Sequence, residues 1–255
     1  MTRRGFTLFE LVFTLFVAGL LMTLLATGVF HAREAARQAA CAANLGQLAT
    51  AALAYAGDHR GEFPWGMRYE GSRMQCWDFR WTSDGRPVPG SIWDGLAGEG
   101  ASRVLQCPSY AARRSGGWME DPYTGYNYNC SYIGKCEGDS GSRLRPATLA
   151  QVRDPARTAL FGDGQYAGGA ANKFMRAPMR EKAHDGSGNA VREAGTQGFR
   201  HLGRTNVAFC DGHVEALSTP YRRGAPGWVS PNCAFLSPDN ALYSLEKAAM
   251  KLPGP

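Results

Sequence analysis

Glu10 is the first side chain in this sequence whose type and position could do chemistry. It stands at the head of twenty uncharged residues, Leu11 to Phe30, which are apolar apart from three threonines and two glycines. At about 1.5 Å per residue, a helix of this length crosses the hydrocarbon core of a bilayer. A carboxylate at such a position is costly to bury alone, so it needs a cationic partner or a functional role.

The residues before this run indicate how the segment is inserted. Arg3 and Arg4 followed by an apolar run are typical of a secretory signal peptide. However, the basic region is short, the apolar run is longer than a signal peptide needs, and no A-x-A-like site closes it. An uncleaved membrane anchor with both arginines on the cytoplasmic side fits better.

The string GFTLFE, from Gly5 to Glu10, resembles the prepilin leader junction of type IV pilins and type II secretion pseudopilins. The resemblance implies that a prepilin peptidase removes residues 1–5 by cutting after Gly5, and that the new amine of Phe6 is methylated. It also implies that Glu10 neutralises the N-terminal amine of a neighbouring subunit during filament assembly. The alternative is a signal anchor whose glutamate sits at the membrane interface.

A second signature lies near the C-terminus. His201 and the pair Asp211-Gly212 are separated by nine residues, and this resembles the H-x9-D-G signature of a large DUF1559-like family of prepilin-like proteins. The strings CAANLGQL (41–48), LQCPS (105–109), GYNY (125–128) and DPARTALFGD (154–163) are also similar to that family. We expect His201, Asp211 and Gly212 to serve local structure, because turn aspartates usually bond to the backbone.

Metal binding is the alternative for these residues. Major pseudopilins hold calcium in a C-terminal loop, so the resemblance makes Asp163, Asp185 and Asp211 candidate calcium ligands. The spacing of an EF-hand loop is absent. A centre built from His201, His213 and Asp211 is disfavoured, because His213 and Asp211 flank the same tight turn. We therefore expect no cofactor other than calcium.

Cysteine content indicates the redox compartment. The anchor predicts export of all seven cysteines, so disulfides are expected, with one thiol left over. Cys41, set among helix-forming alanines, is the expected free thiol. The disulfide candidates are Cys76, Cys107, Cys130, Cys136, Cys210 and Cys233, which allow fifteen connectivities. No C-x2-C pair supports a structural zinc site.

Catalytic motifs are missing from the sequence. It has no G-x-S-x-G elbow, H-E-x-x-H pair or phosphate-binding glycine loop, so we expect no enzyme. A net charge of +6 without a long basic run gives no reason to expect nucleic-acid binding. The second functional class is a membrane-tethered module that binds a glycan or another polymer through its aromatic residues, among them Trp65, Tyr69, Trp77, Trp81 and Trp93.

The elements that position these residues begin with one long helix. Leu45, Leu48, Ala52, Tyr55 and Ala56 recur at helical spacing, and no proline lies between Phe6 and Glu62. We therefore expect a transmembrane helix over 6–30 that continues as an amphipathic helix over 31–57, a rod of about 75 Å. The globular domain, 58–255, is rich in glycine and proline, which predicts short strands and long loops.

Within the domain, the predicted strands are 125–133, 158–161 and a hairpin within 201–217, and loops are expected at 162–171 and 184–198. Helical spacing predicts a last helix over 239–251. Asp211-Gly212 predicts a two-residue type I′ turn, which would pair Cys210 with His213 and Phe209 with Val214 and place the hairpin over the second half of the long helix.

The fold class predicted from these elements is α+β and pilin-like, with a long N-terminal helix packed on an antiparallel sheet domain. The expected location is the inner membrane, crossed once, with a cytoplasmic N-terminus and the domain outside the cytoplasm. The expected partners are prepilin peptidase, other pilin-like subunits, membrane lipid, and a secretion or pilus assembly machinery.

Overall fold

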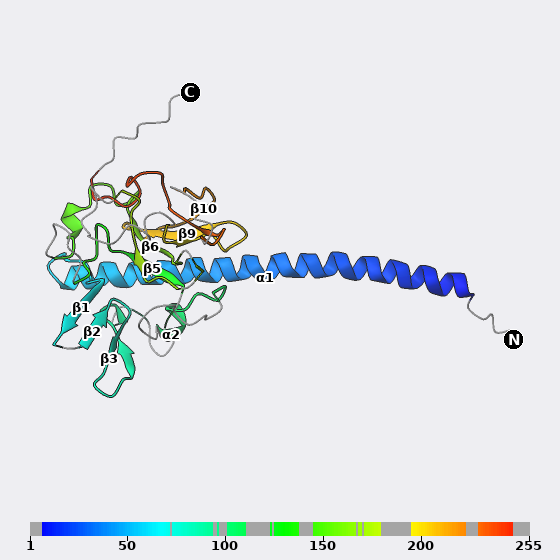
Figure 1. The fold of residues 1–255 in the computed structure, drawn as a ribbon, viewed down its shortest axis with the longest axis horizontal. Coiled ribbons are helices and arrows are strands. Elements are labelled where there is room, and N and C mark those ends of the chain that lie inside the picture. Colours follow the sequence, from blue (N-terminus) through cyan, green and yellow to red (C-terminus); the bar gives the residue numbers. More distant parts are fainter. Residues whose placement is uncertain are drawn as a thin grey trace, which may run out of the picture.

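The computed structural model describes residues 7–71, 73–93, 96, 101–110, 123, 125–137, 145–166, 168–169, 171–179, 195–222 and 229–246. Figure 1 shows one long helix, α1, whose second half is surrounded by strands and loops while its first half projects alone. The predicted α+β arrangement, a long N-terminal helix packed on a sheet domain, is confirmed.

Helix α1 runs unbroken over Leu8–Asp58, 51 residues, so the predicted single rod is confirmed. Thr7 caps its first turn. At the other end Arg60 and Gly61 adopt positive φ, and the Gly61 amide donates to the Ala56 carbonyl at 2.7 Å. A left-handed residue that returns a hydrogen bond to the last turn is a common way for helices to stop.

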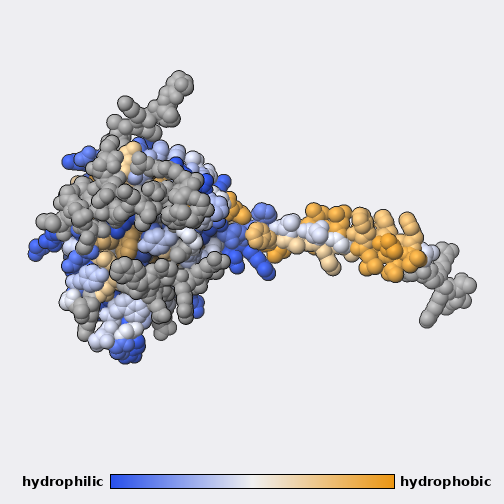
Figure 2. All heavy atoms as spheres, in the orientation of Figure 1, coloured by the Kyte–Doolittle hydropathy of each residue, from blue (hydrophilic) through white to orange (hydrophobic). Residues whose placement is uncertain are grey.

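The two halves of α1 meet different surroundings. The large side chains of the first half are exposed, with Leu8 at 78% and Phe9 at 79%. In the second half the side chains on one face are fully buried: Cys41, Leu45, Leu48, Ala49, Ala51, Ala52 and Ala56. Figure 2 shows the first half as an apolar rod, and the coloured part of the domain surface in this view is mostly hydrophilic. By length and composition, α1 is able to cross a membrane.

The strands form three sheets among the described residues. The first is an antiparallel sheet in chain order: β1 (Met67–Glu70), β2 (Arg73–Cys76), β3 (Phe79–Trp81) and β4 (Pro87–Pro89). The second has the order β10-β9-β6-β5-β7, with β5 (Tyr126–Asn129), β6 (Ala159–Asp163), β7 (Phe174–Met175), β9 (Thr205–Phe209) and β10 (Val214–Leu217). The third pairs β8 (Gln197–Gly198) with β11 (Cys233–Ala234). The short helices are α2 (Ala101–Val104) and the 3-10 turn η3 (Leu149–Gln151).

The five-stranded sheet packs on the second half of α1 and forms the core with it. Its strands are antiparallel except for the pair β5–β7. Strands β6, β9 and β10 contact α1 directly. Within this core, the rings of Trp77, Tyr128 and Phe161 pack on one another with centroids 4.9 to 6.2 Å apart. The alanines of α1 let the sheet approach closely, and each of the three aromatic rings buries a large apolar surface.

The hairpin of β9 and β10 lies over α1 as predicted, but its predicted register is wrong by one residue. Val214 pairs with Ala208 and Glu215 with Val207. The Phe209 amide donates to the His213 carbonyl, and Gly212 has φ of +92° while Asp211 does not have positive φ. The turn is therefore a three-residue loop with a left-handed glycine, not a two-residue type I′ turn. Stacking of the Phe209 and His213 rings, 4.6 Å between centroids, accompanies this register.

Three further predictions need correction. Gly162 and Asp163, expected in a loop, are the last residues of β6. A Cβ at Gly162 would lie 2.6 Å from Gln197 Oε1, so the glycine lets the strand pass close to this side chain. In the described part of the predicted C-terminal helix, residues 239–246, the chain forms turns and no helix. Within the predicted loop 184–198, residues 184–194 lie outside the described residues and Gln197–Gly198 form β8.

Candidate functional site

Glu10 lies in the first turn of α1 and is exposed. Its Oε2 accepts hydrogen bonds from the Thr7 amide at 2.9 Å and from Thr7 Oγ1 at 2.8 Å, while the Glu10 amide donates to Thr7 Oγ1 at 3.3 Å. These contacts form a capping box, in which each side chain satisfies the other residue's backbone amide. Gly5 and Phe6 lie outside the described residues, so the predicted cleavage and methylation rest on the sequence alone.

His201 and Asp211-Gly212 lie at opposite ends of β9. His201 precedes the strand in a tight turn that includes Leu202 and Gly203, both with positive φ. Asp211 follows the strand, where its Oδ1 accepts from the His213 amide at 3.1 Å and contacts His213 Nδ1 at 2.6 Å. His201 and Asp211 therefore fix the turns at the two ends of one strand, and they do not share a site.

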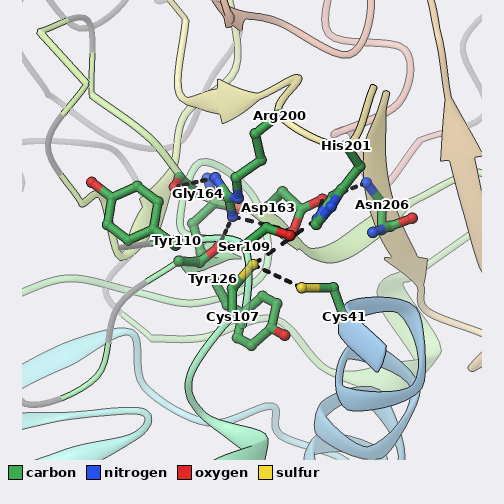
Figure 3. A network of polar contacts seen from close by, with 12 residues as sticks. Cys41, Cys107, Ser109, Tyr110, Tyr126, Asp163, Gly164, Arg200, His201 and Asn206 are labelled. Atoms are coloured by element: carbon green, nitrogen blue, oxygen red, sulfur yellow. Dashed lines mark hydrogen bonds and ion pairs between the residues drawn. The ribbon is translucent and has the colours of Figure 1, made fainter. Parts of the chain in front are cut away.

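His201 is part of a buried polar cluster that we define by Cys41, Cys107, Asp163 and His201, and whose side-chain donor atoms lie within 4.8 Å of one another. Figure 3 shows Cys41 on α1 facing Cys107, with Asp163 and His201 on the far side of the sulfur pair. The Sγ atoms are 2.7 Å apart, Cys107 Sγ lies 4.0 Å from His201 Nε2, and His201 Nε2 lies 3.3 Å from Asp163 Oδ2. Four segments distant in sequence meet here.

Charged groups surround this cluster. Glu34 of α1 contacts His201 Nδ1 at 3.2 Å and accepts from Ser109 Oγ at 2.7 Å. Arg200 Nη2 lies 3.2 Å from Asp163 Oδ1, and the Asn206 amide donates to Asp163 Oδ2 at 2.6 Å. Two carboxylates thus face a guanidinium and an imidazole, so groups of opposite charge pair within the site.

The cluster perturbs its titrating groups. Burial alone would lower the pKa of His201, but its contacts with Asp163 and Cys107 raise the pKa to about 10, so the imidazole is protonated. Burial likewise opposes ionisation of Cys107, yet contacts with Cys41 and His201 and the charge of Arg200 lower its pKa to about 5. The neighbouring Cys107 and burial raise the pKa of Cys41. One thiol of the pair is therefore poised as a thiolate and the other stays protonated.

The donor set raises the question of a metal. Two sulfurs bound to one tetrahedral zinc at about 2.3 Å each would be about 3.8 Å apart, well beyond the 2.7 Å contact between Cys41 and Cys107. Asp163 also already bonds to Arg200 and to the Asn206 amide. We assign no metal to the cluster.

The predicted calcium ligands do not converge. Asp163 lies beside Asn206 near the start of β9, whereas Asp211 follows the end of that strand, and Asp185 lies outside the described residues. Asp163 and Asp211 thus lie near opposite ends of β9, and the calcium ligands stay predictions.

All seven cysteines are buried and have free thiols in the structure, so the predicted disulfides stay predictions. Cys41, the expected free thiol, faces Cys107 with 2.7 Å between the two Sγ atoms. Cys130 and Cys136 both lie against Gly66, where a Cβ would collide with the sulfur of Cys130 and lie 3.1 Å from that of Cys136. These two are therefore also neighbours.

Sequence reasoning missed this cluster as a site, although the signal was present. Four of the five strings that carry the family resemblance supply one member each: Cys41 from CAANLGQL, Cys107 from LQCPS, Asp163 from DPARTALFGD and His201 from the H-x9-D-G signature. Tyr126 of GYNY lies beside them and accepts from Asn44 Nδ2 at 3.1 Å. Nothing local to any single string indicates that the strings meet.

Comparison with known proteins identifies a family over part of the chain. Residues 30–82 match the model of a family described as "Protein of unknown function (DUF1559)". The predicted resemblance is confirmed over this segment, which contains the second half of α1, β1, β2 and β3. No curated protein and no solved structure matches the chain.

Proposed function

We propose that this protein is a non-enzymatic prepilin-like or pseudopilin-like subunit that assembles through α1 into a filament of the type IV pilus or type II secretion kind. The observation that carries the proposal is the change along one helix: its first half exposes large apolar side chains, and its second half is buried in a domain. An exposed apolar helix needs lipid or other helices as its surroundings.

The proposed topology and processing follow from the N-terminal sequence. Residues 6–30 cross the inner membrane once, with the N-terminus cytoplasmic and the domain outside the cytoplasm. Prepilin peptidase cuts after Gly5, and the new amine on Phe6 is methylated. The secretion or pilus assembly machinery then extracts the subunit from the membrane.

Glu10 is the proposed assembly contact. In the single chain its Oε2 takes both bonds from Thr7, and in the filament we assign Oε1 to the Phe6 amine of the neighbouring subunit. A buried pair of opposite charges favours the correct register of neighbouring subunits. In any other register the carboxylate stays in lipid without its partner, which costs on the order of 2.5 to 3.5 kcal/mol.

The test compares Glu10→Ala, Glu10→Asp and wild type for leader cleavage and for assembly. Glu10→Ala should leave cleavage largely intact and abolish filaments, and Glu10→Asp should restore part of the assembly because it retains the charge. Glu215→Gln, which removes a carboxylate from the exposed side of β10, is the matched control and should assemble normally. Filaments of Glu10→Ala at wild-type yield would refute the pairing role.

Mass spectrometry of the membrane-extracted N-terminus tests processing separately. A chain that begins at methylated Phe6 supports the proposal. An intact Met1 in a strain with active prepilin peptidase would overturn it.

A second candidate function is binding of a polymer such as a glycan by the tethered domain. The observation in its favour is a cavity of about 470 Å³ between the end of α1 and the four-stranded sheet, whose lining includes Tyr55, Trp65, Arg68 and Arg80. Aromatic faces flanked by hydrogen-bond donors suit a sugar ring. Retention of the chain on immobilised polysaccharide, lost in Trp65→Ala, would favour this function, whereas equal retention of both proteins would exclude this cavity.

A further inference from the structure

The place of the sulfur pair in the fold is the first step. Cys41 is the first buried residue along α1, so it marks the membrane-proximal edge of the domain. Cys107 follows α2, in a segment held to α1 by the bond from Ser109 to Glu34 and by a long contact of 3.4 Å from Asn44 to the Gln106 carbonyl. The pair thus sits where the bare helix enters the domain.

We infer that Cys41 and Cys107 form a disulfide that fastens the domain to α1 at this edge. Their Sγ atoms, at 2.7 Å, are already closer than two sulfurs on one metal ion would be, and a small side-chain movement completes a bond of about 2.05 Å. The inference rests on the proposed topology in one respect, since that topology places both thiols in an oxidising compartment.

The bond forms by thiol–disulfide exchange with an oxidising disulfide, either a small molecule or a thiol–disulfide oxidoreductase. The Cys107 thiolate attacks one sulfur of the oxidant, giving a mixed disulfide and releasing one thiolate. Cys41 then loses its proton to solvent and attacks the Cys107 sulfur, releasing the second thiolate. The two cysteines lose two electrons and two protons in all, and the disulfide of the oxidant becomes two thiols.

The burial of Cys41 and Cys107 determines when the disulfide can form. Cys41 and Cys107 are 0% and 1% exposed in the folded chain, so exchange must precede closure of the domain over α1. Once formed, the bond is shielded from reductants in solution. The disulfide closes a loop from Cys41 to Cys107 that contains the whole four-stranded sheet, β1 to β4. The sheet is then joined to α1 on both sides, by the chain that leaves the end of the helix and by the disulfide.

Peptide mapping of the full-length protein tests the assignment. Membranes are quenched with an alkylating agent in denaturant, and the protein is digested with trypsin without reductant. The expected result is peptide 38–60 joined to peptide 104–113, lighter by two hydrogens than the two thiol peptides together. Alkylation of both cysteines before any reductant is added, or one zinc per chain that chelator must remove before alkylation, would overturn it.

Thermal unfolding of variants supplies an independent readout. Cys41→Ala, Cys107→Ala and the double variant should show the same fall in Tm, on the order of 10 °C, because each removes the same loop closure. Cys233→Ala removes a buried thiol that donates to the Gly195 carbonyl, and as the matched control its effect should add to theirs. Losses that sum in the double variant would indicate packing alone and refute the disulfide.

Refolding in vitro separates this inference from the proposed function. Full-length chain that is fully reduced, denatured and then refolded in detergent with oxidised glutathione should yield the same joined peptides. If the pair forms in vitro but is reduced in cells, the disulfide geometry stands and the export topology is refuted. If it fails to form in vitro, the inference is refuted whatever the N-terminus shows.

Discussion

The two halves of α1 have the same secondary structure and opposite relations to their surroundings. The first half presents leucine, phenylalanine and methionine outward on every side, and the second half presents alanine and a few leucines inward on one face. Large exposed side chains suit fluid lipid, whereas small buried ones let a sheet pack within contact distance. On the proposed topology, one helix thus passes from lipid into the domain along its length, and side-chain volume as well as hydropathy differs between its two halves.

A charge in the middle of each half should give the largest contrast. Leu21→Lys places an ammonium in the proposed span and should cost about 3 kcal/mol of insertion free energy, so that much of the protein becomes extractable from membranes by alkaline carbonate. Thr50→Lys, on the exposed face of the second half, should leave extraction unchanged. Equal extraction of the two variants would contradict the assignment of the halves.

Truncation of a leucine in each half reverses that contrast. Leu48→Ala empties a fully buried position and should lower the free energy of unfolding by about 3 kcal/mol. Leu21→Ala, at a position 54% exposed, should leave it unchanged. Urea unfolding of the detergent-solubilised chain, followed by tryptophan fluorescence, measures both, and a large loss in Leu21→Ala would show that the first half packs on the domain.

The pH dependence of stability probes the cluster at the junction of the halves. The pKa of His201, raised to about 10 in the folded chain, lies above its unfolded value near 6.5, so protonation favours the folded state. His201 faces Glu34, Asp163 and Cys107. Arg200 pairs with the same Asp163.

We therefore expect a contribution of about 2 kcal/mol that is complete below pH 6.5 and is lost as pH rises towards 10. Oxidised protein is used, so that Cys107 does not titrate. Asp163 then raises the His201 pKa without the contribution of Cys107, so the loss of stability is complete below pH 10. His201→Gln should abolish the slope. The exposed His59 at the end of α1 serves as control in His59→Gln, which should keep the slope, and a wild-type profile that is flat over this range would exclude the protonated imidazole.

Two glycines give the smallest predicted effects. Gly212→Ala forces a side chain onto a residue with φ of +92° in the β9–β10 turn and should cost about 1 kcal/mol. Gly57→Ala lies in the last turn of α1 with open space around it and should be neutral or stabilising by up to about 1 kcal/mol. The same urea titration distinguishes them, and a stabilising Gly212→Ala would contradict the observed turn.

Local signals in the sequence predicted the elements better than their contacts. The absence of proline from Phe6 to Glu62 and the run of alanines predicted one continuous helix, because helix formation depends on neighbours in the chain. The Asp-Gly pair located the hairpin but not its register, since pairing of Phe209 with His213 across a three-residue loop competes with the two-residue turn. Gly162 suggested a loop, yet it lies in strand β6, where the missing side chain leaves room for Gln197.

The cluster was beyond prediction from any one segment. Its sulfur pair joins residues 66 positions apart, and Glu34 reaches His201 across 167. Such contacts depend on how the sheet packs on α1. The spacing of apolar residues along the chain does not specify this packing. The four family strings held the members, but only the fold shows that they meet.

Only a short charged stretch of α1 separates Phe30 from the start of the domain. Glu34 already bonds to Ser109 and His201 of the domain, and the helix rises about 6 Å from Phe30 to Glu34. A headgroup layer is also about 6 Å thick. With the lipid boundary of the proposed span at Phe30, the lower edge of the domain therefore rests at the level of the headgroups, and the bare stem of the helix is reached only through lipid.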